Sequence, residues 1–212
     1  MYKKISESRI AKYIIFSFFF WITAFYLMNR SFEAGKFGAG GSDAFTQMYP
    51  AMLYISRVIR EFVCALFKGQ TYCLPMLEWS LGMGENTISA LNYYGFGDPF
   101  YIVSAFFNED QMPYFFTVFF YARMYLGGVV CIVLLEEIDS TRSVFSYVIA
   151  ALVYVFSGFG IQSNIFIIFV HALMYTPLMV LGAERTIKEK KKGILTFAVF
   201  LYALSGFFFL YV

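Results

Sequence analysis

The residues most able to carry chemistry in this chain lie in one polar and aromatic segment between its first two apolar stretches. Asp43 comes directly after a glycine-rich run that contains Gly35, Gly38, Gly40 and Gly41. No Gly-Lys-Ser/Thr sequence follows, so this run is not a Walker loop. A carboxylate in this place could act as a general base on a hydroxyl group, orient that hydroxyl, or hold a divalent cation. It could equally close an Asx turn or cap a helix, and its residue type alone favours that structural role.

Further along the same segment, carboxylates and amides alternate with aromatic and glycine residues. The candidates for contacts with a ligand are Gln47, Glu78, Trp79, Asn86 and Asp98. Aromatic rings that stack on sugars, beside carboxylates that accept hydroxyl groups, are typical of a carbohydrate or headgroup pocket. A packed loop has the same texture, with Asp98 as a turn residue before a proline and Glu78 in a salt bridge.

Two polar residues fall inside apolar stretches. Arg123 lies in the second stretch, where a charge is costly unless it is paired or hydrated. Its planar guanidinium could meet a lipid phosphate, or it could form a structural pair with Asp43 or Asp98 or reach toward the interface. His171, the only histidine, is expected to hydrogen-bond to a neighbouring helix rather than to act in a site.

The composition indicates that a lipid bilayer surrounds most of the chain. The 212 residues are 60% hydrophobic and 22% aromatic, and only 14% are charged, whereas soluble domains average about 25% charged residues. A bilayer is the natural solvent for that much apolar surface. The net charge of +2 is too small to indicate a nucleic-acid partner. The three cysteines are predicted to be free thiols, and none has the spacing of a zinc site.

Five apolar stretches are predicted to be transmembrane helices, which makes the fold class an all-α membrane protein. Basic residues precede the first stretch, as in a signal peptide, but no small-residue cleavage site follows it, so we predict a retained anchor. The short third stretch indicates tilt or a thin patch of bilayer, and a tight turn over 158–164 follows it. The predicted spans are 12–28, 114–135, 144–158, 165–182 and 193–212, and residues 29–113 form one long loop.

Basic residues mark the cytoplasmic side of a membrane protein. Two basic groups, at the N-terminus and between the fourth and fifth predicted spans, fall on one side if the chain crosses the bilayer five times. We therefore expect a cytoplasmic N-terminus and an extracytoplasmic loop over 29–113, with Glu136, Glu137, Asp139 and Arg142 in a solvated cytoplasmic turn. The two basic groups are Lys3, Lys4, Arg9 and Lys12, and Arg185, Lys188, Lys190, Lys191 and Lys192.

A helix from Pro50 to Lys68 is predicted within the long loop. Pro50 suits the first helical turn and Gly69 suits the position after the C-cap. Apolar residues at positions 52, 55, 59, 63 and 66 form a stripe at helical spacing, while Arg57 and Arg60 lie on another face. Such an amphipathic helix either lies among lipid headgroups or packs onto the helix bundle, and these two interpretations are compatible.

Taken in order, the loop motifs resemble those of bacterial YfhO-type membrane proteins, which are similar to GT-C glycosyltransferases. The resemblance covers the long loop and, more loosely, the spans after it. Members of that family are much longer than this chain, and the apolar end at Tyr211 and Val212, without a polar tail, also suggests a piece of a longer protein or a module that depends on a partner. The motifs are Gly41-Ser42-Asp43, Gln47, Pro50, Trp79-Ser80-Leu81-Gly82-Met83-Gly84, Tyr93-Tyr94 and Asp98-Pro99.

The resemblance implies a GT-C-like fold and a site on the outer face of a bacterial cell membrane. GT-C enzymes take a sugar from a polyprenyl-phosphate donor and use an acidic residue soon after the first span, which Asp43 matches. The implied partners are a lipid-linked sugar donor, a cell-wall polymer acceptor such as lipoteichoic acid, and membrane lipid. The implied roles are catalysis for Asp43 and substrate binding for Arg123, Asp98, Glu78, Trp79 and Gln47, with a Mg or Mn ion at Asp43 as an optional cofactor.

A non-enzymatic role is the second hypothesis. Glycine-rich breaks and a buried arginine also occur in membrane transporters. The chain could therefore be a transporter, or an assembly subunit, for lipid-linked precursors of the cell envelope. An inactive fragment that keeps the fold and has lost the reaction is a third possibility.

Overall fold

The computed structural model describes residues 2–33, 43–81, 84–165 and 167–206, and these are mainly helical. The glycine-rich run before Asp43, Gly82 and Met83, and the last residues of the fifth predicted span lie outside the described residues. The long helices are α1 (Tyr2–Glu33), α2 (Tyr49–Phe67), α4 (Met112–Ile138), α5 (Val144–Val155), α7 (Val170–Glu189) and α8 (Gly193–Gly206).

Short elements connect these helices. The tight turn predicted over 158–164 instead contains the short helix α6, whose first turn is capped by the Ser157 hydroxyl on the Gly160 amide. The short elements are the π-helical turn η1 (Ala44–Met48), β1 (Leu77–Glu78), β2 (Glu85–Asn86), α3 (Thr87–Asn92), the 3-10 helices η2 (Pro99–Phe106), η3 (Glu109–Gln111) and η4 (Ile167–Phe169), and α6 (Gly158–Gln162).

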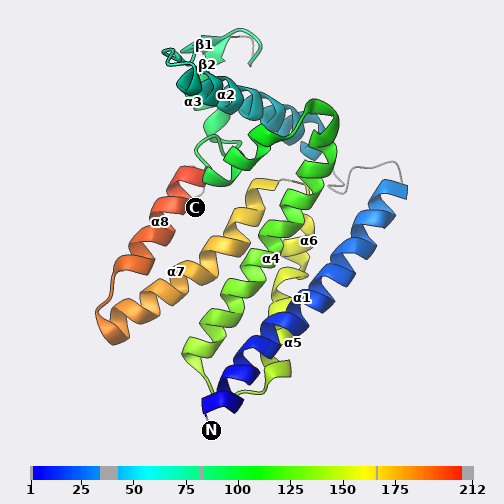
Figure 1. The fold of residues 1–212 in the computed structure, drawn as a ribbon, viewed down its shortest axis with the longest axis vertical. Coiled ribbons are helices and arrows are strands. Elements are labelled where there is room, and N and C mark those ends of the chain that lie inside the picture. The colour runs from blue at the N-terminus through cyan, green and yellow to red at the C-terminus, as the bar shows by residue number, and fades with distance from the viewer. Residues whose placement is uncertain (1, 34–42, 82–83, 166, 207–212) are drawn as a thin grey trace.

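The helices form a bundle with one elaborated end (Figure 1). Helices α1, α4, α5 and α7 run alongside one another, and α8 packs against α7. Helix α2 lies across the end of the bundle that is far from the N-terminus, together with α3 and the antiparallel pair β1–β2. We call this the loop end and the opposite end the N-terminal end.

Among the described residues, two helices are long and apolar enough to cross a bilayer. They are Ile10–Arg30 within α1, with a mean hydropathy of 1.7, and Glu109–Ile138 through α4, with a mean hydropathy of 2.0. Helices α5 and α8 are apolar but shorter. Both helices agree with the predicted membrane location, whereas the predicted number of five spans stays a prediction.

Aromatic side chains join α1 to α4. Phe16 and Phe20 are fully buried, and their ring centroids lie 5.6 Å and 5.5 Å from that of Tyr125 on α4. Such ring pairs add favourable contact energy to the burial of their apolar surface. The outward faces of both helices carry exposed apolar residues, among them Phe18, Phe25 and Val118, as expected for surfaces in contact with lipid.

Charged pairs tie the helices together at the N-terminal end. Lys12, which is 3% exposed, pairs with Glu136, and the Arg185 guanidinium lies 2.8 Å from the Glu137 carboxylate. The interpretation of Glu136 and Glu137 as part of a solvated turn is therefore wrong, because one joins α4 to α1 and the other joins α4 to α7. Their adjacent positions near the end of an apolar stretch gave no indication of which helices would lie opposite.

Helix α2 begins and ends almost where the sequence predicts. Pro50 lies in its first turn, and Gly69 after its end has a left-handed backbone with φ of 64°. The Gly69 amide donates to the Leu66 carbonyl at 3.1 Å, and the Gln70 amide donates to the Ala65 carbonyl at 2.9 Å. These two bonds form a Schellman motif, which satisfies carbonyl groups that the end of a helix leaves free.

Candidate functional site

A cavity of about 420 Å³ lies at the loop end, between the start of α2 and the segment that contains β2 and α3. Its wall combines aromatic rings with a carboxylate, hydroxyl groups and an amide, as ligand sites of this size often do. Tyr93 and Tyr94 form an edge-to-face pair in this wall, with ring centroids 5.2 Å apart. The lining residues used below are Gln47, Ser80, Glu85, Ser89, Tyr93 and Tyr94.

Asp43 stands beside this cavity and does not serve as a helix cap. It occupies the position before η1 with helical backbone angles, and its side chain makes no capping hydrogen bond. Its Oδ1 instead accepts a hydrogen bond from Nε2 of Gln47 at 3.3 Å, and Gln47 lines the cavity. Partial burial, the neighbouring Tyr94 and the negative charge of Asp43 together raise the pKa of Tyr93, so the carboxylate lies within electrostatic reach of the cavity wall.

Glu78 and Trp79 lie on the hairpin beside the cavity rather than in its wall. Glu78 accepts hydrogen bonds from the Ser80 amide and hydroxyl at 3.2 Å and 2.9 Å and from the Tyr54 hydroxyl at 3.3 Å. The two Ser80 bonds are the main reason that the pKa of Glu78 is lowered. Trp79 is 76% exposed, with its ring beside Gly84. Glu78 therefore joins the hairpin to α2 through its bond with Tyr54. The ligand contacts predicted for Glu78 and Trp79 stay predictions.

Asn86, another of the predicted ligand contacts, caps α3. Its Oδ1 accepts a hydrogen bond from the Ser89 amide at 3.1 Å, and its extended backbone is typical of an N-cap. The cap fixes the start of the helix that carries Ser89 and Ala90 into the cavity wall.

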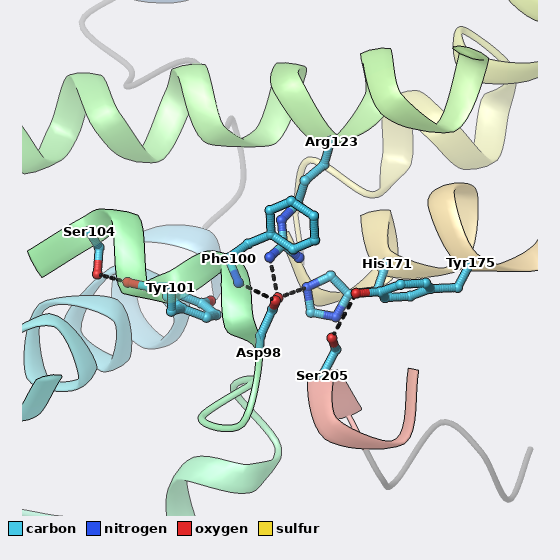
Figure 2. A network of polar contacts seen from close by, with 8 residues as sticks. All are labelled: Asp98, Phe100, Tyr101, Ser104, Arg123, His171, Tyr175 and Ser205. Carbon is cyan, nitrogen blue, oxygen red and sulfur yellow. Dashed lines mark hydrogen bonds and ion pairs between the residues drawn. The ribbon is translucent and has the colours of Figure 1, made fainter. Parts of the chain in front are cut away.

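Asp98, Arg123 and His171 meet in a buried cluster beneath the loop (Figure 2). They are 2%, 1% and 0% exposed. Arg123 donates from Nη2 to Oδ2 of Asp98, and Nε2 of His171 lies 2.9 Å from the same oxygen, at an angle poor for a hydrogen bond. The Phe100 amide donates to the other carboxylate oxygen of Asp98 at 2.9 Å.

The electrostatics of this cluster favour a charged Asp98. Burial by itself raises the pKa of a carboxyl group, but the charge of Arg123 and the contact with His171 outweigh burial, so the pKa of Asp98 is lowered. The Arg123 guanidinium also lies over the Phe119 ring, 4.2 Å from its centroid, in a favourable cation–π contact. The pair between Arg123 and Asp98 is one of the alternatives that the sequence left open.

The structure thus separates the predicted residues into two groups. Asp43 and Gln47 lie together at the cavity, and Asp98 and Arg123 lie together in the buried cluster. His171 belongs to the second group, although its sequence indicated only a contact with a neighbouring helix. Its one available signal was that of a lone ionisable residue in an apolar segment, which in membrane proteins usually faces another polar group.

The described residues contain no group of three or more His, Cys, Asp and Glu side chains that could hold a metal ion. Asp43 would have to share a cation with a ligand or with water. The predicted Mg or Mn ion therefore stays a prediction that rests on this single carboxylate.

These features define an α-helical membrane protein with a polar cavity and a buried ion-pair cluster at one end. The chain belongs to the family described as bacterial membrane protein YfhO, which matches residues 13–212. This confirms the family that the loop motifs suggested. No curated protein and no solved structure matches the chain.

Proposed function

We propose that this chain is a GT-C-like membrane glycosyltransferase or the N-terminal part of one. It would transfer a sugar from a polyprenyl-phosphate donor to a hydroxyl group of a cell-surface polymer, such as lipoteichoic acid, on the outer face of the membrane. One observation carries the proposal: Asp43 is free of any capping role and is hydrogen-bonded to a residue in the wall of a polar and aromatic cavity.

The proposed orientation follows from the charges at the two ends of the bundle. The N-terminal end holds Lys12 and Arg185 beside Glu136 and Glu137, and the basic run Lys190 to Lys192 follows α7. An excess of lysine and arginine marks the cytoplasmic side. Helices α1, α4, α5, α7 and α8 would then cross the bilayer with the N-terminus in the cytoplasm, and the cavity would lie outside.

The proposed reaction is a single displacement at the anomeric carbon of the donor sugar. The acceptor hydroxyl oxygen forms a bond to that carbon, while the bond from the carbon to the phosphate oxygen breaks. The polyprenyl phosphate leaves with the bonding electrons, and Asp43 accepts the proton of the hydroxyl group. One displacement inverts the configuration of the anomeric carbon. Gln47 would hold Asp43 in place, and the Tyr93–Tyr94 pair offers apolar faces to a sugar ring.

Arg123 needs a different role from the one that the resemblance suggested. A contact with the leaving phosphate requires guanidinium N–H groups that are open to the substrate, whereas Arg123 is only 1% exposed and its Nη2 donates to Asp98. We therefore place Arg123 in the support of the site and keep the chemical step at Asp43.

The test replaces Asp43 by Asn in the full-length natural protein. Membranes from cells that carry it would receive a radiolabelled polyprenyl-phosphate sugar, and label in the surface polymer would be counted. Loss of a general base lowers a rate by about 100-fold to 10,000-fold. Asp110→Asn is the matched control, because Asp110 is an exposed acid in η3 near the start of α4. Protein amounts would be compared by immunoblot.

Each outcome of this test separates the hypotheses. Transfer that falls only in Asp43→Asn supports the proposal. If transfer by the unmodified protein survives in EDTA, Asp43 acts in base catalysis rather than in metal binding. Transfer that is unchanged in Asp43→Asn, at normal protein levels, would contradict the catalytic role of Asp43. The transporter or assembly-subunit hypothesis would then be the better one, and it predicts altered precursor export without any transfer by the purified protein.

A further inference from the structure

The buried cluster of Asp98, Arg123 and His171 joins three elements that are far apart in the sequence. Asp98 belongs to the turn before η2, Arg123 to α4 and His171 to α7 (Figure 2). A hydrogen bond between the Tyr175 hydroxyl and the Ser205 hydroxyl, at 3.1 Å, lies next to it and adds α8. The loop is therefore connected through one point to three helices of the bundle.

The composition of the cluster indicates that it selects one arrangement of the loop against the helices rather than adding stability. Among the described residues, Nε and Nη1 of Arg123 and Nδ1 of His171 have no hydrogen-bond partner. Buried polar groups normally have one, and a group that lacks one is costly. Replacing a buried ion pair by apolar side chains often leaves a protein equally or more stable, and the best-attested use of such a pair is to select one arrangement.

The path from Asp98 to the cavity wall is short and hydrogen-bonded throughout. The Tyr94 amide donates to the Leu91 carbonyl at 2.9 Å, the Gly95 amide donates to the Asn92 carbonyl at 3.1 Å, and the Asp98 amide donates to the Gly95 carbonyl at 2.9 Å. Tyr93 and Tyr94 lie within this run of turns. These turns link the backbone of Asp98 to the backbone that carries both rings.

The same turn also rests directly on α8. A Cβ atom at Gly97 would overlap the carbonyl oxygen of Leu204, and a Cβ atom at Gly95 would lie 3.1 Å from the carbonyl oxygen of Ser205. At Gly97 only glycine permits this approach of two backbones. Arg123 and His171 thus hold one side of the turn while α8 supports the other.

We propose that Asp98, Arg123 and His171 form a lock that positions the Tyr93–Tyr94 wall of the cavity relative to the helix bundle. These three are positioning residues, because they lie outside the cavity and act on it through the turn. The consequence for sugar transfer rests on the proposed function: opening the lock raises the KM for the acceptor more than it lowers kcat. A loss of folded protein would lower the apparent kcat and leave KM unchanged.

The position of the wall can be measured without any substrate. Two nitroxide spin labels are attached through Ser89→Cys on α3 and Val118→Cys on α4, both at exposed positions. The full-length protein is placed in lipid nanodiscs, and pulsed electron paramagnetic resonance gives the distribution of distances between the labels. The native cysteines are first replaced through Cys64→Ser, Cys73→Ser and Cys131→Ala.

Asp98→Asn removes the charge that both partners share, and it should at least double the width of the distance distribution. His171→Gln removes one partner and keeps a polar side chain, so it gives a second variant if Asp98→Asn is not recovered as folded protein. Asp139→Asn is the control, because it breaks another Asp–Arg pair, with Arg142, that is exposed at the N-terminal end. Its distribution should match that of the unmodified chain.

A distribution as narrow in the lock variants as in the parent would overturn the proposal. Equal broadening in Asp139→Asn would also overturn it, because the effect would then be a general loosening of the chain. Neither result depends on transferase activity. If Asp43→Asn leaves transfer unchanged while the lock variants broaden the distribution, the proposed function fails and the lock stands.

Discussion

Removal of the Asp98 carboxylate should destabilise the bundle strongly, and removal of Arg123 as well should restore most of the loss. Asp98→Ala leaves the guanidinium of Arg123, which is 1% exposed, without a counter-charge. Two charges about 4 Å apart interact by about 4 kcal/mol at an effective dielectric constant of about 20. Breaking a buried pair by removing one partner costs about 3–5 kcal/mol in measured cases. Both routes give a loss of similar size.

The double variant Asp98→Ala/Arg123→Met isolates the ionic contribution. Methionine fills part of the volume of the arginine stem and needs no partner, so its flexible side chain can pack against Phe119. We expect the single variant Asp98→Ala to lower the Tm by about 6–20 °C, from about 2–4 °C for each kcal/mol in a chain of this size. The double variant should recover more than half of that decrease.

The assay is thermal unfolding of the purified 212-residue chain in one detergent at one scan rate, followed by circular dichroism. A Tm for Asp98→Ala within 2 °C of the parent would refute the reasoning, since it would mean that water or another group hydrates Arg123. The reasoning would also be refuted if the Tm decrease of the double variant equalled the sum of the decreases of Asp98→Ala and Arg123→Met alone. Such additivity means that the two side chains do not interact.

Three further predictions follow from single features. The pKa of Asp98 is lowered from 3.8 in the folded protein. The charged carboxylate therefore stabilises the fold fully above that value, and this stabilisation disappears as the pH falls below it. The Tm difference between the parent and Asp98→Ala should be constant from pH 7 to pH 5 and shrink below about pH 4. Gly69→Ala should cost about 1–2 kcal/mol through its left-handed backbone alone, since no atom lies within 4 Å of the added Cβ, and chemical unfolding measures it. Cys64, an exposed free thiol on α2, should react with a membrane-impermeant maleimide in intact cells when Cys73 is replaced by Ser. Ser140→Cys at the other end of the bundle, in a chain with Cys64→Ser and Cys73→Ser, should react only after lysis; the reverse pattern would overturn the proposed orientation.

The sequence predicted those parts of the fold that depend on local rules. The limits of α2 came within about one residue, because Pro50 and Gly69 act on the backbone of their own neighbourhood. Its apolar stripe was predicted in full, yet only the first half is buried: Ile55 is 0% exposed and Leu66 is 60% exposed. The spacing of apolar residues defines a face of a helix, but the length of that face that meets the bundle depends on tertiary structure.

The sequence identified the residues of the candidate site but not which of them contact one another. Asp98 was seen as a turn residue or a ligand contact, and Arg123 was seen as a phosphate contact or half of an ion pair. Asp98 precedes Pro99 and does cap the following 3-10 helix through the Phe100 amide. It has two acceptor oxygens, so it fills the local role with one and pairs with Arg123 through the other. Local rules describe only the first of these two bonds.

The position of Arg123 explains why the loop has to be held so firmly. A guanidinium in an apolar helix is tolerated only where a counter-charge reaches it, and α4 supplies none among the residues that surround Arg123. The counter-charge comes from the loop, so α4 can bury its arginine only when the loop is docked. The docked loop also fixes the position of the turn that carries Tyr93 and Tyr94. The buried charge of Arg123 therefore links the folding of the bundle to the shape of the cavity, because both depend on the docked loop.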